Sequence, residues 1–302
     1  MSRTLTLLTI HAHPDDETIA TGGIMAKYAA EGARVICVTC TGGEHGEIVV
    51  PEMDTPENHA KLAELRAVEL RRALERLGPI ESHQLGYVDS GMMGTPENEA
   101  PEAFWNADVD EAVGKVVRII REARPHVLVG YNDFGGYGHP DHIRAAEIAK
   151  LAWERAGDPS CYPEHLAEGI PAWRPQKLYE TAFDADARER EELQAVLRDR
   201  GMKAWWLPAD DETDDQKAER EAFMTRMVEA TGPITTRVDV SGLLDRKLEA
   251  AREHVTQLAE SGFFLALTVD DWKRFFPTEN FTLRESLVGV RIPEDDLFAG
   301  LR

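Results

Sequence analysis

The sequence predicts an α/β protein: a Rossmann-like layer sandwich with a mostly parallel sheet, followed by a smaller C-terminal α+β portion. Three observations support this fold class. Short apolar runs alternate with amphipathic stretches, which is typical of parallel strands joined by helical crossovers. Clusters of histidine and aspartate follow two of these runs, and ligands gather at the carboxyl ends of strands in such sheets. The 302 residues are 42% hydrophobic, which is enough for one enlarged domain or two smaller ones.

Apolar runs and helical periodicity alternate along most of the chain. The strand-like runs are residues 5–10, 35–40, 82–86, 127–131 and 234–240. The spacing of apolar side chains predicts helices at residues 17–31, 59–77, 109–124, 140–156 and 242–258. Gly32 and Gly78 lie where the first two of these helices should end, since glycine commonly follows the last helical turn. No glycine fingerprint for a dinucleotide accompanies this pattern.

The character of the sequence changes along the chain, and we expect a core (1–183) and a C-terminal extension (184–302). Residues 184–222 are dense in charge. They are predicted to form a solvated helix and an acidic loop around 210–215 rather than a binding surface. The tail from residue 263 is rich in phenylalanine and tryptophan. We therefore expect the extension to pack back on the core and to help shape a ligand pocket.

Composition limits the function classes. A formal net charge of −21 argues against nucleic acid or an anionic membrane surface as the main partner. No apolar stretch approaches the roughly 20 residues of a membrane span, and the N-terminus does not resemble a signal peptide. We therefore expect a cytoplasmic protein with no membrane partner. Cys37 and Cys40 lie in a strand-like run, where positions three apart point to opposite faces, so a redox role is not expected.

Two clusters of metal-ligating residue types follow two of the apolar runs. The first is residues 11–17, His-Ala-His-Pro-Asp-Asp-Glu, and the second is residues 137–142, Tyr-Gly-His-Pro-Asp-His. His13 and Asp16 lie three positions apart around a proline, so a turn can aim both inward, and His142 can supply a third ligand. A hydrolytic zinc site needs about three protein ligands and an open fourth position. The same two-histidine, one-carboxylate set also serves non-haem Fe(II) oxygenases.

Groups beside these candidate ligands favour hydrolysis of an amide. Asp15 could take a proton from a water that the metal activates, and His139 could act as an imidazolium acid. Asp141 could orient His139 and favour its charged form, while the hydroxyl of Tyr137 could stabilise an oxyanion. An oxygenase has no need for such an acid–base pair. The oxygenase and a non-catalytic sugar- or nucleotide-binding module stay open as alternatives, because Asp15 and Asp16 could simply be acids favoured at a helix N-terminus.

Other polar positions give weaker signals. Gly43, a candidate substrate-binding residue, lies in a glycine-rich loop at 41–47 that could bring the main chain close to a ligand. Arg66 lies in a predicted helix, and a place on its exposed face would account for an arginine there. Asp89 could equally form a turn. Structural or core positions are expected for five further side chains, namely His11, His83, His126, Tyr131 and Tyr179.

With these residues the chain resembles the LmbE-like/PIG-L family of zinc-dependent N-acetylglucosaminyl deacetylases and amidases. The resemblance rests on HAHPDDE at 11–17 and GGYGHPDH at 135–142, which are specific in combination. It continues through TGGEHGEI, LGYVDSGM, RPHVLVGY and HVTQL to FFPTENF and LFAGL, and so covers nearly the whole chain. The most similar branches are the mycothiol S-conjugate amidases and, as their sister group, the inositol–glucosamine deacetylases. Ala20 stands where the amidases usually carry a lysine, whereas Gly138 resembles the deacetylases.

The resemblance implies a hydrolase that binds Zn²⁺, with Fe²⁺ as an alternative, and cleaves an amide on a glucosamine-like amino group or a thiol conjugate. The implied metal ligands are His13, Asp16 and His142. The implied catalytic groups are Asp15 as general base, His139 as acid or oxyanion stabiliser, Tyr137 as a substrate-facing phenol and Asp141 as the partner of His139. Arg66 and Asp89 would bind hydroxyl groups of a sugar or cyclitol, with His254 approaching from the C-terminal region. The expected partners are a small amino-sugar or thiol-conjugate substrate and, in a homo-oligomer, further copies of the chain.

Overall fold

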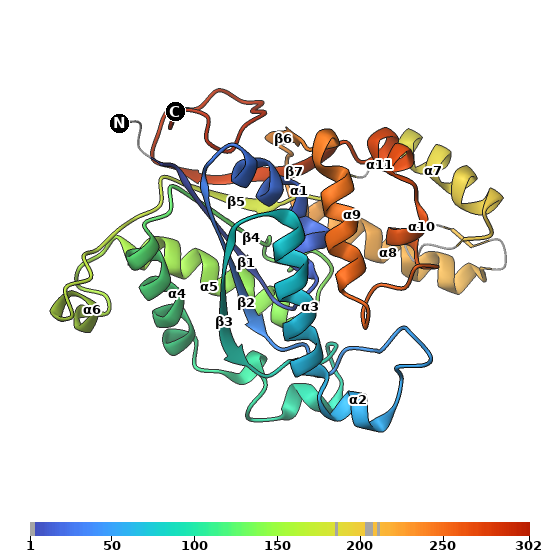
Figure 1. Ribbon diagram of the computed structural model, residues 1–302, viewed down its shortest axis with the longest axis horizontal. Helices are drawn as coiled ribbons and strands as arrows, with labels where there is room; N and C mark the ends of the chain where they lie inside the picture. Colours follow the sequence, from blue (N-terminus) through green and yellow to red (C-terminus); the bar gives the residue numbers. More distant parts are fainter. Residues whose placement is uncertain (1–3, 185–186, 203–207, 210–211) are drawn as a thin grey trace.

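The computed structural model describes residues 4–184, 187–202, 208–209 and 212–302. Seven strands in these ranges form one sheet with the order β3-β2-β1-β4-β5-β7-β6 (Figure 1). Their bounds are Thr6–His11 (β1), Arg34–Thr41 (β2), Ile80–Tyr87 (β3), Val127–Gly130 (β4), Lys177–Thr181 (β5), Thr236–Asp239 (β6) and Thr278–Ser286 (β7). Strands β1 to β5 run parallel, and β7 pairs antiparallel with β5 and β6. The predicted α/β fold with a mostly parallel sheet is confirmed.

Helices cover both faces of this sheet. The larger ones are Asp16–Ala30 (α1), Leu62–Leu77 (α3), Val109–Ala123 (α4), Pro140–Ala156 (α5), Ala187–Asp199 (α7), Asp214–Thr231 (α8) and Leu244–Glu253 (α9). The shorter ones are Pro56–Ala60 (α2), Pro163–Ala167 (α6), Phe263–Ala266 (α10) and Val269–Phe275 (α11). Side chains of α1, α3 and α9 share one buried cluster, and those of α4 and α5 share the other. In Figure 1 the sheet accordingly lies between the α4–α5 pair and the α3–α9 pair.

The strands divide their side chains between the two clusters in strict alternation. Leu7 and Val35 belong to the cluster with α1, whereas Leu8 and Ile36 belong to the cluster with α4. This follows from the two-residue period of a strand, and it explains why the strand segments are apolar throughout. The same alternation separates the cysteines, because Cys37 lies in the first cluster and Cys40 in the second. The expectation that they point to opposite faces is confirmed.

The C-terminal region contributes strands to the same sheet as the N-terminal region. β7 pairs with β5 and carries β6 on its other side. Phe281 on β7 and Phe298 in the tail are fully buried in the cluster that contains α1. These two aromatic side chains of the C-terminal region therefore pack in the same cluster as α1. A division of the chain into two domains at residue 183 stays a prediction.

Two predicted helices differ from the structure at their ends. The periodic stretch 59–77 is interrupted at Lys61, whose φ of −124° is not helical, so α2 and α3 are separate. The stretch 242–258 is helical only to Glu253, because His254 turns away with φ −82° and ψ 58°. Both interruptions fall inside continuous apolar periodicity, which carries no information about where the main chain must turn to make a tertiary contact.

The acidic segment is partly helical. Residues 210–211 of the predicted acidic loop lie outside the described residues. Asp214 and Asp215 form the first turn of α8, and Thr213 caps it by accepting a hydrogen bond from Gln216. Carboxylates are favoured there by the helix dipole. Within the described ranges, no helix combines the length and the apolar character that crossing a membrane requires.

Candidate metal centre and active site

The two clusters of histidine and aspartate meet at one edge of the sheet. β1 and β4 are adjacent and parallel, so the segments that follow them leave the sheet on the same side. His13 lies just beyond β1, and Asp16 begins α1. His142 lies in the first turn of α5, which follows β4. The fold therefore brings together the side chains of His13, Asp16 and His142.

Three ligand-type atoms of these residues form a nearly equilateral triangle. His13 Nδ1 lies 3.4 Å from Asp16 Oδ2 and 3.2 Å from His142 Nε2. Asp16 Oδ2 and His142 Nε2 are 3.3 Å apart. Tetrahedral coordination with the metal–ligand bond lengths of zinc separates neighbouring ligand atoms by about 3.3 Å. The three atoms are therefore spaced as ligands of one divalent cation.

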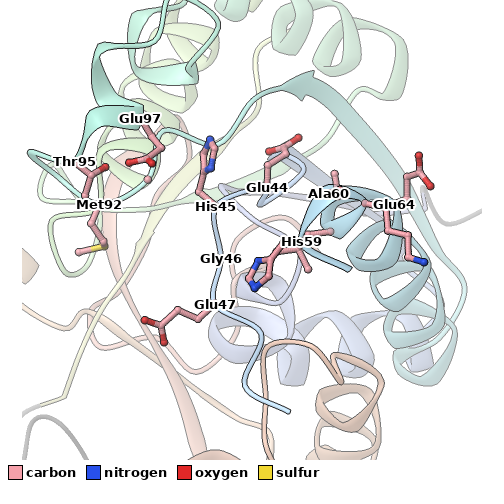
Figure 2. Close-up of a pocket in the computed structure, with 14 residues that line it drawn as sticks. Glu44, His45, Gly46, Glu47, His59, Ala60, Glu64, Met92, Thr95 and Glu97 are labelled. Atoms are coloured by element: carbon pink, nitrogen blue, oxygen red, sulfur yellow. The ribbon is translucent and has the colours of Figure 1, made fainter. Parts of the chain in front are cut away.

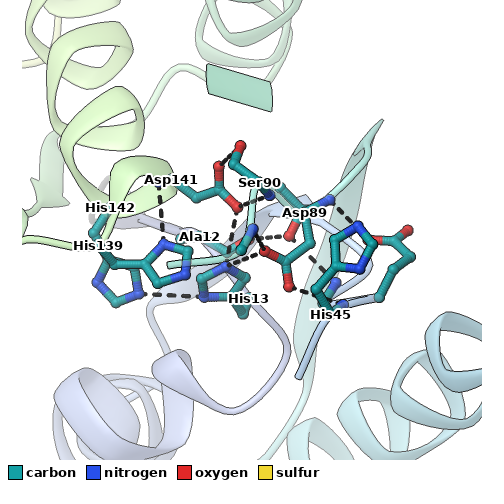
Figure 3. Close-up of polar contacts among 12 residues, drawn as sticks. Ala12, His13, His45, Asp89, Ser90, His139, Asp141 and His142 are labelled. Atoms are coloured by element: carbon teal, nitrogen blue, oxygen red, sulfur yellow. Dashed lines mark hydrogen bonds and ion pairs between the residues drawn. The ribbon is translucent and has the colours of Figure 1, made fainter. Parts of the chain in front are cut away.

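The other ring nitrogen of His13 faces carboxylates. Its Nε2 lies 3.2 Å from Asp141 Oδ2 and 3.7 Å from Asp89 Oδ1. Asp141 is itself fixed, because Ser90 donates to it from both its main-chain nitrogen and its hydroxyl (Figure 3). A carboxylate that accepts the second N–H of a metal-binding histidine fixes the ring tautomer and increases its basicity. Nδ1 of His13 is then left with its lone pair toward the triangle.

The assignment of Asp141 as the partner of His139 differs from the structure. The carboxylate of Asp141 contacts His13 and Ser90, and only its main-chain nitrogen donates to His139 Nδ1, at 3.1 Å. The reason is that His139 is the N-cap of α5, so its side chain accepts a hydrogen bond from the first turn of the helix. An accepting Nδ1 places the proton of the neutral ring on Nε2.

Further ligand-type side chains lie buried around the triangle. They form two groups, which are His13, His139 and His142, and His13, Asp89, His139 and Asp141. Residues of this region could therefore hold a metal ion in more than one way. The triangle is the better set of metal ligands, because both other groups contain His139, whose Nδ1 already caps α5. The second group also contains Asp141, whose carboxylate already accepts two hydrogen bonds from Ser90.

His139 and Tyr137 place neutral hydrogen-bond donors beside the triangle. Burial lowers the pKa of His139 to about 3, and the neighbouring His13 and His142 act in the same direction. The ring is therefore neutral near pH 7, which differs from the expectation of an imidazolium acid. The hydroxyl of Tyr137 lies 3.5 Å from His142 Nε2, and burial raises the pKa of this phenol. Both groups can donate to an oxygen that gains negative charge.

Asp15 lies in a strained main-chain conformation beside the triangle. Its φ is 131°, a region that costs a non-glycine residue about 1–3 kcal/mol. Arg66 Nη2 donates to the carbonyl oxygen of Pro14 at 2.7 Å and lies 3.3 Å from Asp15 Oδ1. Burial raises the pKa of the Asp15 carboxyl to about 6, although Arg66 opposes the shift. A carboxylate with a pKa nearer neutrality is better matched to accepting a proton.

Arg66, Gly43 and Asp89 fix the loops that border the site. Arg66 is only 3% exposed, and its Nη1 donates to the carbonyl oxygen of Gly43 at 3.0 Å. Gly43 has φ +69°, and a Cβ there would lie 2.2 Å from Arg66 Nη1, so a side chain at this position would strain the loop and displace Arg66. Asp89 accepts hydrogen bonds from the main-chain nitrogens of Gly91 and His45, at 2.8 and 3.3 Å. In this structure all three residues make contacts within the protein.

His254 reaches the site from the C-terminal region, behind α1. Its Nε2 lies 2.8 Å from Glu17 Oε1 and 3.4 Å from the hydroxyl of Thr18. The side chain of His254 has no exposed surface. The resemblance implied that His254 approaches the site. In the structure, its side chain contacts residues of α1.

Sequence reasoning missed the role of Tyr131, which was expected to be an ordinary core residue. Its hydroxyl accepts a hydrogen bond from the main-chain nitrogen of Ala12 at 3.1 Å, and burial and the nearby charge of Asp16 raise the pKa of this phenol. Its ring also packs on His142, with centroids 4.5 Å apart. The position of Tyr131 directly after β4, beside the end of β1, is the signal that could have marked it.

A groove of about 730 Å³ adjoins this centre (Figure 2). Asp89 connects the two, since its main-chain nitrogen donates to Glu44 Oε2 at 2.9 Å and its carboxylate accepts from His45. The acidic side chains that line the groove are Glu44, Glu47, Glu64 and Glu97. Carboxylates accept hydrogen bonds from hydroxyl groups and repel anions. Lys61, His45 and His59 also line the groove, so the four carboxylates leave it an acidic excess that suits hydroxyl groups better than anions.

Comparison by sequence identifies relatives of the whole chain. The model of the PIG-L family, described as GlcNAc-PI de-N-acetylase, matches residues 8–153, which contain both clusters. A protein of Catenulispora acidiphila named 1D-myo-inositol 2-acetamido-2-deoxy-alpha-D-glucopyranoside deacetylase 1 is 42% identical. That match covers 98% of this chain and 89% of the relative.

Solved structures share the fold. N,N'-diacetylchitobiose deacetylase from Pyrococcus horikoshii has a TM-score of 0.61 at 18% identity and covers 92% of this chain and 83% of its own. The 4-carboxy-2-hydroxymuconate hydratase GalB from Pseudomonas putida has a TM-score of 0.59 at 17% identity, with 95% and 99% covered. The hydratase illustrates that a fold does not by itself determine the chemistry. Sequence identity over nearly the full length decides the relationship instead, and this chain belongs to the PIG-L family.

Proposed function

We propose that this chain is a Zn²⁺-dependent N-deacetylase that hydrolyses the acetamide of a glucosamine unit joined to a polyol such as inositol. The observation that carries the proposal is the triangle of His13 Nδ1, Asp16 Oδ2 and His142 Nε2, with Asp15 directly beside it. The name of the Catenulispora relative, an inositol acetamido-glucopyranoside deacetylase, supports the substrate class. Two imidazoles and one carboxylate suit Zn²⁺, and Fe²⁺ accepts the same ligands.

The residues of the chain divide the chemistry between them. His13, Asp16 and His142 would hold the cation, whose positive charge would acidify a water molecule and polarise the amide carbonyl. Asp15 accepts a proton from the attacking water, since its carboxyl has a raised pKa and lies next to Asp16. His139, through Nε2–H, donates a hydrogen bond to the carbonyl oxygen as negative charge develops on it. The hydroxyl of Tyr137 donates to the same carbonyl oxygen of the acetamide.

Departure of the amine requires a proton, and the structure favours Asp15 as its source. The lowered pKa of His139 keeps the ring neutral near pH 7, so it has no imidazolium proton to transfer to the amine. Asp15 becomes a neutral acid once it has taken the proton of the water, and its raised pKa suits this exchange. We therefore assign both proton transfers to Asp15 and a hydrogen-bonding role to His139.

The acidic groove favours a substrate with hydroxyl groups on the leaving side. Glu44, Glu47 and Glu97 line the groove next to Asp89, and carboxylates accept hydrogen bonds from a sugar or cyclitol. A cysteine-thiol conjugate, the substrate of the amidase type, is the second candidate. Its peptide-like acyl group would have less to gain from this row of carboxylates.

An amine-release assay tests the proposal. Acetamido-glucosamine linked to inositol, free N-acetylglucosamine and a cysteine-thiol conjugate of the inositol glycoside should be compared without oxygen, with and without added Zn²⁺. The inositol-linked acetamide is expected to give one equivalent of acetate and the highest kcat/KM. Absence of amine release from every substrate in the presence of Zn²⁺, or a requirement for oxygen, would contradict the proposed hydrolysis. Preferred cleavage of the thiol conjugate would instead indicate the amidase type.

Tyr131 gives a prediction about metal affinity. Tyr131→Phe leaves the N–H of Ala12, next to the ligand His13, without its acceptor and changes the ring that packs on His142. Loss of a residue that orients the metal ligands typically weakens metal binding. We therefore expect the Kd for Zn²⁺ to rise about 10- to 100-fold. Titration against a chromophoric chelator measures it.

Tyr179→Phe is the matched control for this prediction. Tyr179 is a buried tyrosine on the neighbouring strand β5, and its hydroxyl donates to Glu294 at 2.7 Å, in the C-terminal tail. The control variant should lose stability and keep the metal affinity of the parent. Equal Zn²⁺ affinity in the Tyr131→Phe and Tyr179→Phe variants would show that Tyr131 is only a core residue.

A further inference from the structure

The strained main chain of Asp15 is held by a hydrogen bond from its own nitrogen. With φ 131° and ψ −34°, Asp15 is not in a conformation that its side chain favours. Its N–H donates to Glu17 Oε2 at 2.8 Å. The carbonyl of Asp15 accepts from Thr18 and Ile19, so the first turn of α1 closes on it as well. Among these contacts, the Glu17 carboxylate is the side chain that fixes the N–H of the strained residue.

Glu17 is a buried carboxylate with a full set of donors. Its side chain has no exposed surface, and Oε1 accepts from the hydroxyl of Thr18 at 2.6 Å and from His254 Nε2 at 2.8 Å. With the Asp15 N–H on Oε2 and these two donors on Oε1, both oxygens of the Glu17 carboxylate are held in place.

His254 is anchored independently of Glu17. It ends α9, and two residues later Thr256 donates to Glu69 from its main-chain nitrogen, at 3.0 Å, and from its hydroxyl, at 2.7 Å. The carbonyl of Thr256 accepts from the main-chain nitrogen of Val49 at 2.9 Å. These bonds tie the segment after α9 to α3 and to the loop after β2. His254 therefore reaches Glu17 from a fixed support, although the two residues are 237 positions apart.

We propose that Glu17 and His254 form a positioning pair that holds the main chain of Asp15 in its strained conformation and so aims the carboxylate of the catalytic base. The inference rests on the proposed function, because it takes Asp15 as that base. Neither residue of the pair has exposed surface, so neither contacts the substrate. Their effect on the reaction passes through Asp15. The C-terminal region thereby completes a site whose other members come from the first half of the chain.

The test uses Glu17→Gln, which keeps the size of the side chain. Its NH₂ group must face either the N–H of Asp15 or Nε2–H of His254, and it can accept a hydrogen bond from neither. We expect kcat to fall about 10- to 100-fold, as for a misplaced catalytic group. KM and the Zn²⁺ content should stay within about twofold of the parent. Glu279→Gln is the matched control, since Glu279 is also a buried carboxylate that accepts from main-chain nitrogens of α1, those of Gly23 and Ile24, but it makes no hydrogen bond with Asp15 or with the pair. That variant should lose stability and keep its kcat.

A double-mutant cycle with Asp15→Asn shows whether the effect passes through Asp15. Residues that act through one group give non-additive losses. Glu17→Gln should therefore lower kcat in the parent and have no further effect in the Asp15→Asn background. Losses that multiply, or an equal loss of kcat in Glu279→Gln, would overturn the positioning role. A fully active Asp15→Asn variant would instead refute the proposed function, so the two failures are distinguishable.

Variants of His254 keep the inference testable if Glu17→Gln does not fold. His254→Gln retains an N–H donor toward Glu17, whereas His254→Leu retains only the bulk. We expect kcat to fall in the leucine variant and to recover at least partly in the glutamine variant, with both giving folded protein by circular dichroism. Equal kcat in the two variants would contradict a role for the hydrogen bond.

Discussion

Asp15→Asn is expected to lower kcat by about 10²–10⁴-fold, the usual contribution of a general acid–base group, while Zn²⁺ stays bound. The amide cannot take a proton from water, so the loss should fall on kcat and kcat/KM alike, as for an interaction made in the transition state. The metal ligands are unaffected, because Asp15 is not part of the triangle formed by His13, Asp16 and His142. Steady-state kinetics and metal analysis of the same preparation measure both quantities.

Asp54→Asn is the control for the loss of an aspartate charge. Asp54 is exposed and pairs with His59 at 2.7 Å, close to the groove, and surface pairs of this kind contribute little. The control should keep kcat within about twofold of the parent. Near-normal deacetylation by Asp15→Asn would remove Asp15 from the mechanism. Loss of the metal in that variant would mean that Asp15 supports the cation rather than the proton transfer.

Most of the sheet could be predicted because each strand carries its own signal. In β1, Leu7 and Leu8 face opposite buried clusters, so the strand is apolar throughout and stands out from the amphipathic helix that follows. Such patterns are local, and chain order then limits the topology. Helix ends were predicted less well. His254 ends α9 through a contact with Glu17 that no local pattern contains.

The same distinction applies to the site. His13 and His142 could be paired from the sequence, because each follows a strand of a parallel sheet and such ends share an edge. The hydrogen bonds that orient them could not be predicted in this way. Asp141 contacts His13 rather than His139 because Ser90, in the segment after β3, fixes its carboxylate. Contacts of this kind depend on how three segments pack, and that is decided by the tertiary structure.

Removal of the cation is expected to abolish turnover and to lower the stability of the fold. Several kcal/mol of transition-state stabilisation correspond to a loss of about 10³-fold or more in kcat. A cation that binds only the folded chain also raises Tm, so chelation should lower it and Zn²⁺ should restore both activity and Tm. His142→Ala removes one corner of the triangle and should show neither the activity nor the rise in Tm with Zn²⁺.

His83→Ala is the control for the metal prediction, because His83 lies on β3 and takes no part in the triangle. It should keep the activity and the Zn²⁺-dependent rise in Tm of the parent. If His142→Ala also responded to Zn²⁺ with an unchanged Kd, the cation would have to be held by another set. The buried group of His13, Asp89, His139 and Asp141 is the alternative that the structure offers, and Asp89→Asn would then be the variant that loses the metal. The same Kd measurements in His142→Ala and Asp89→Asn thus decide which set of ligands the chain uses.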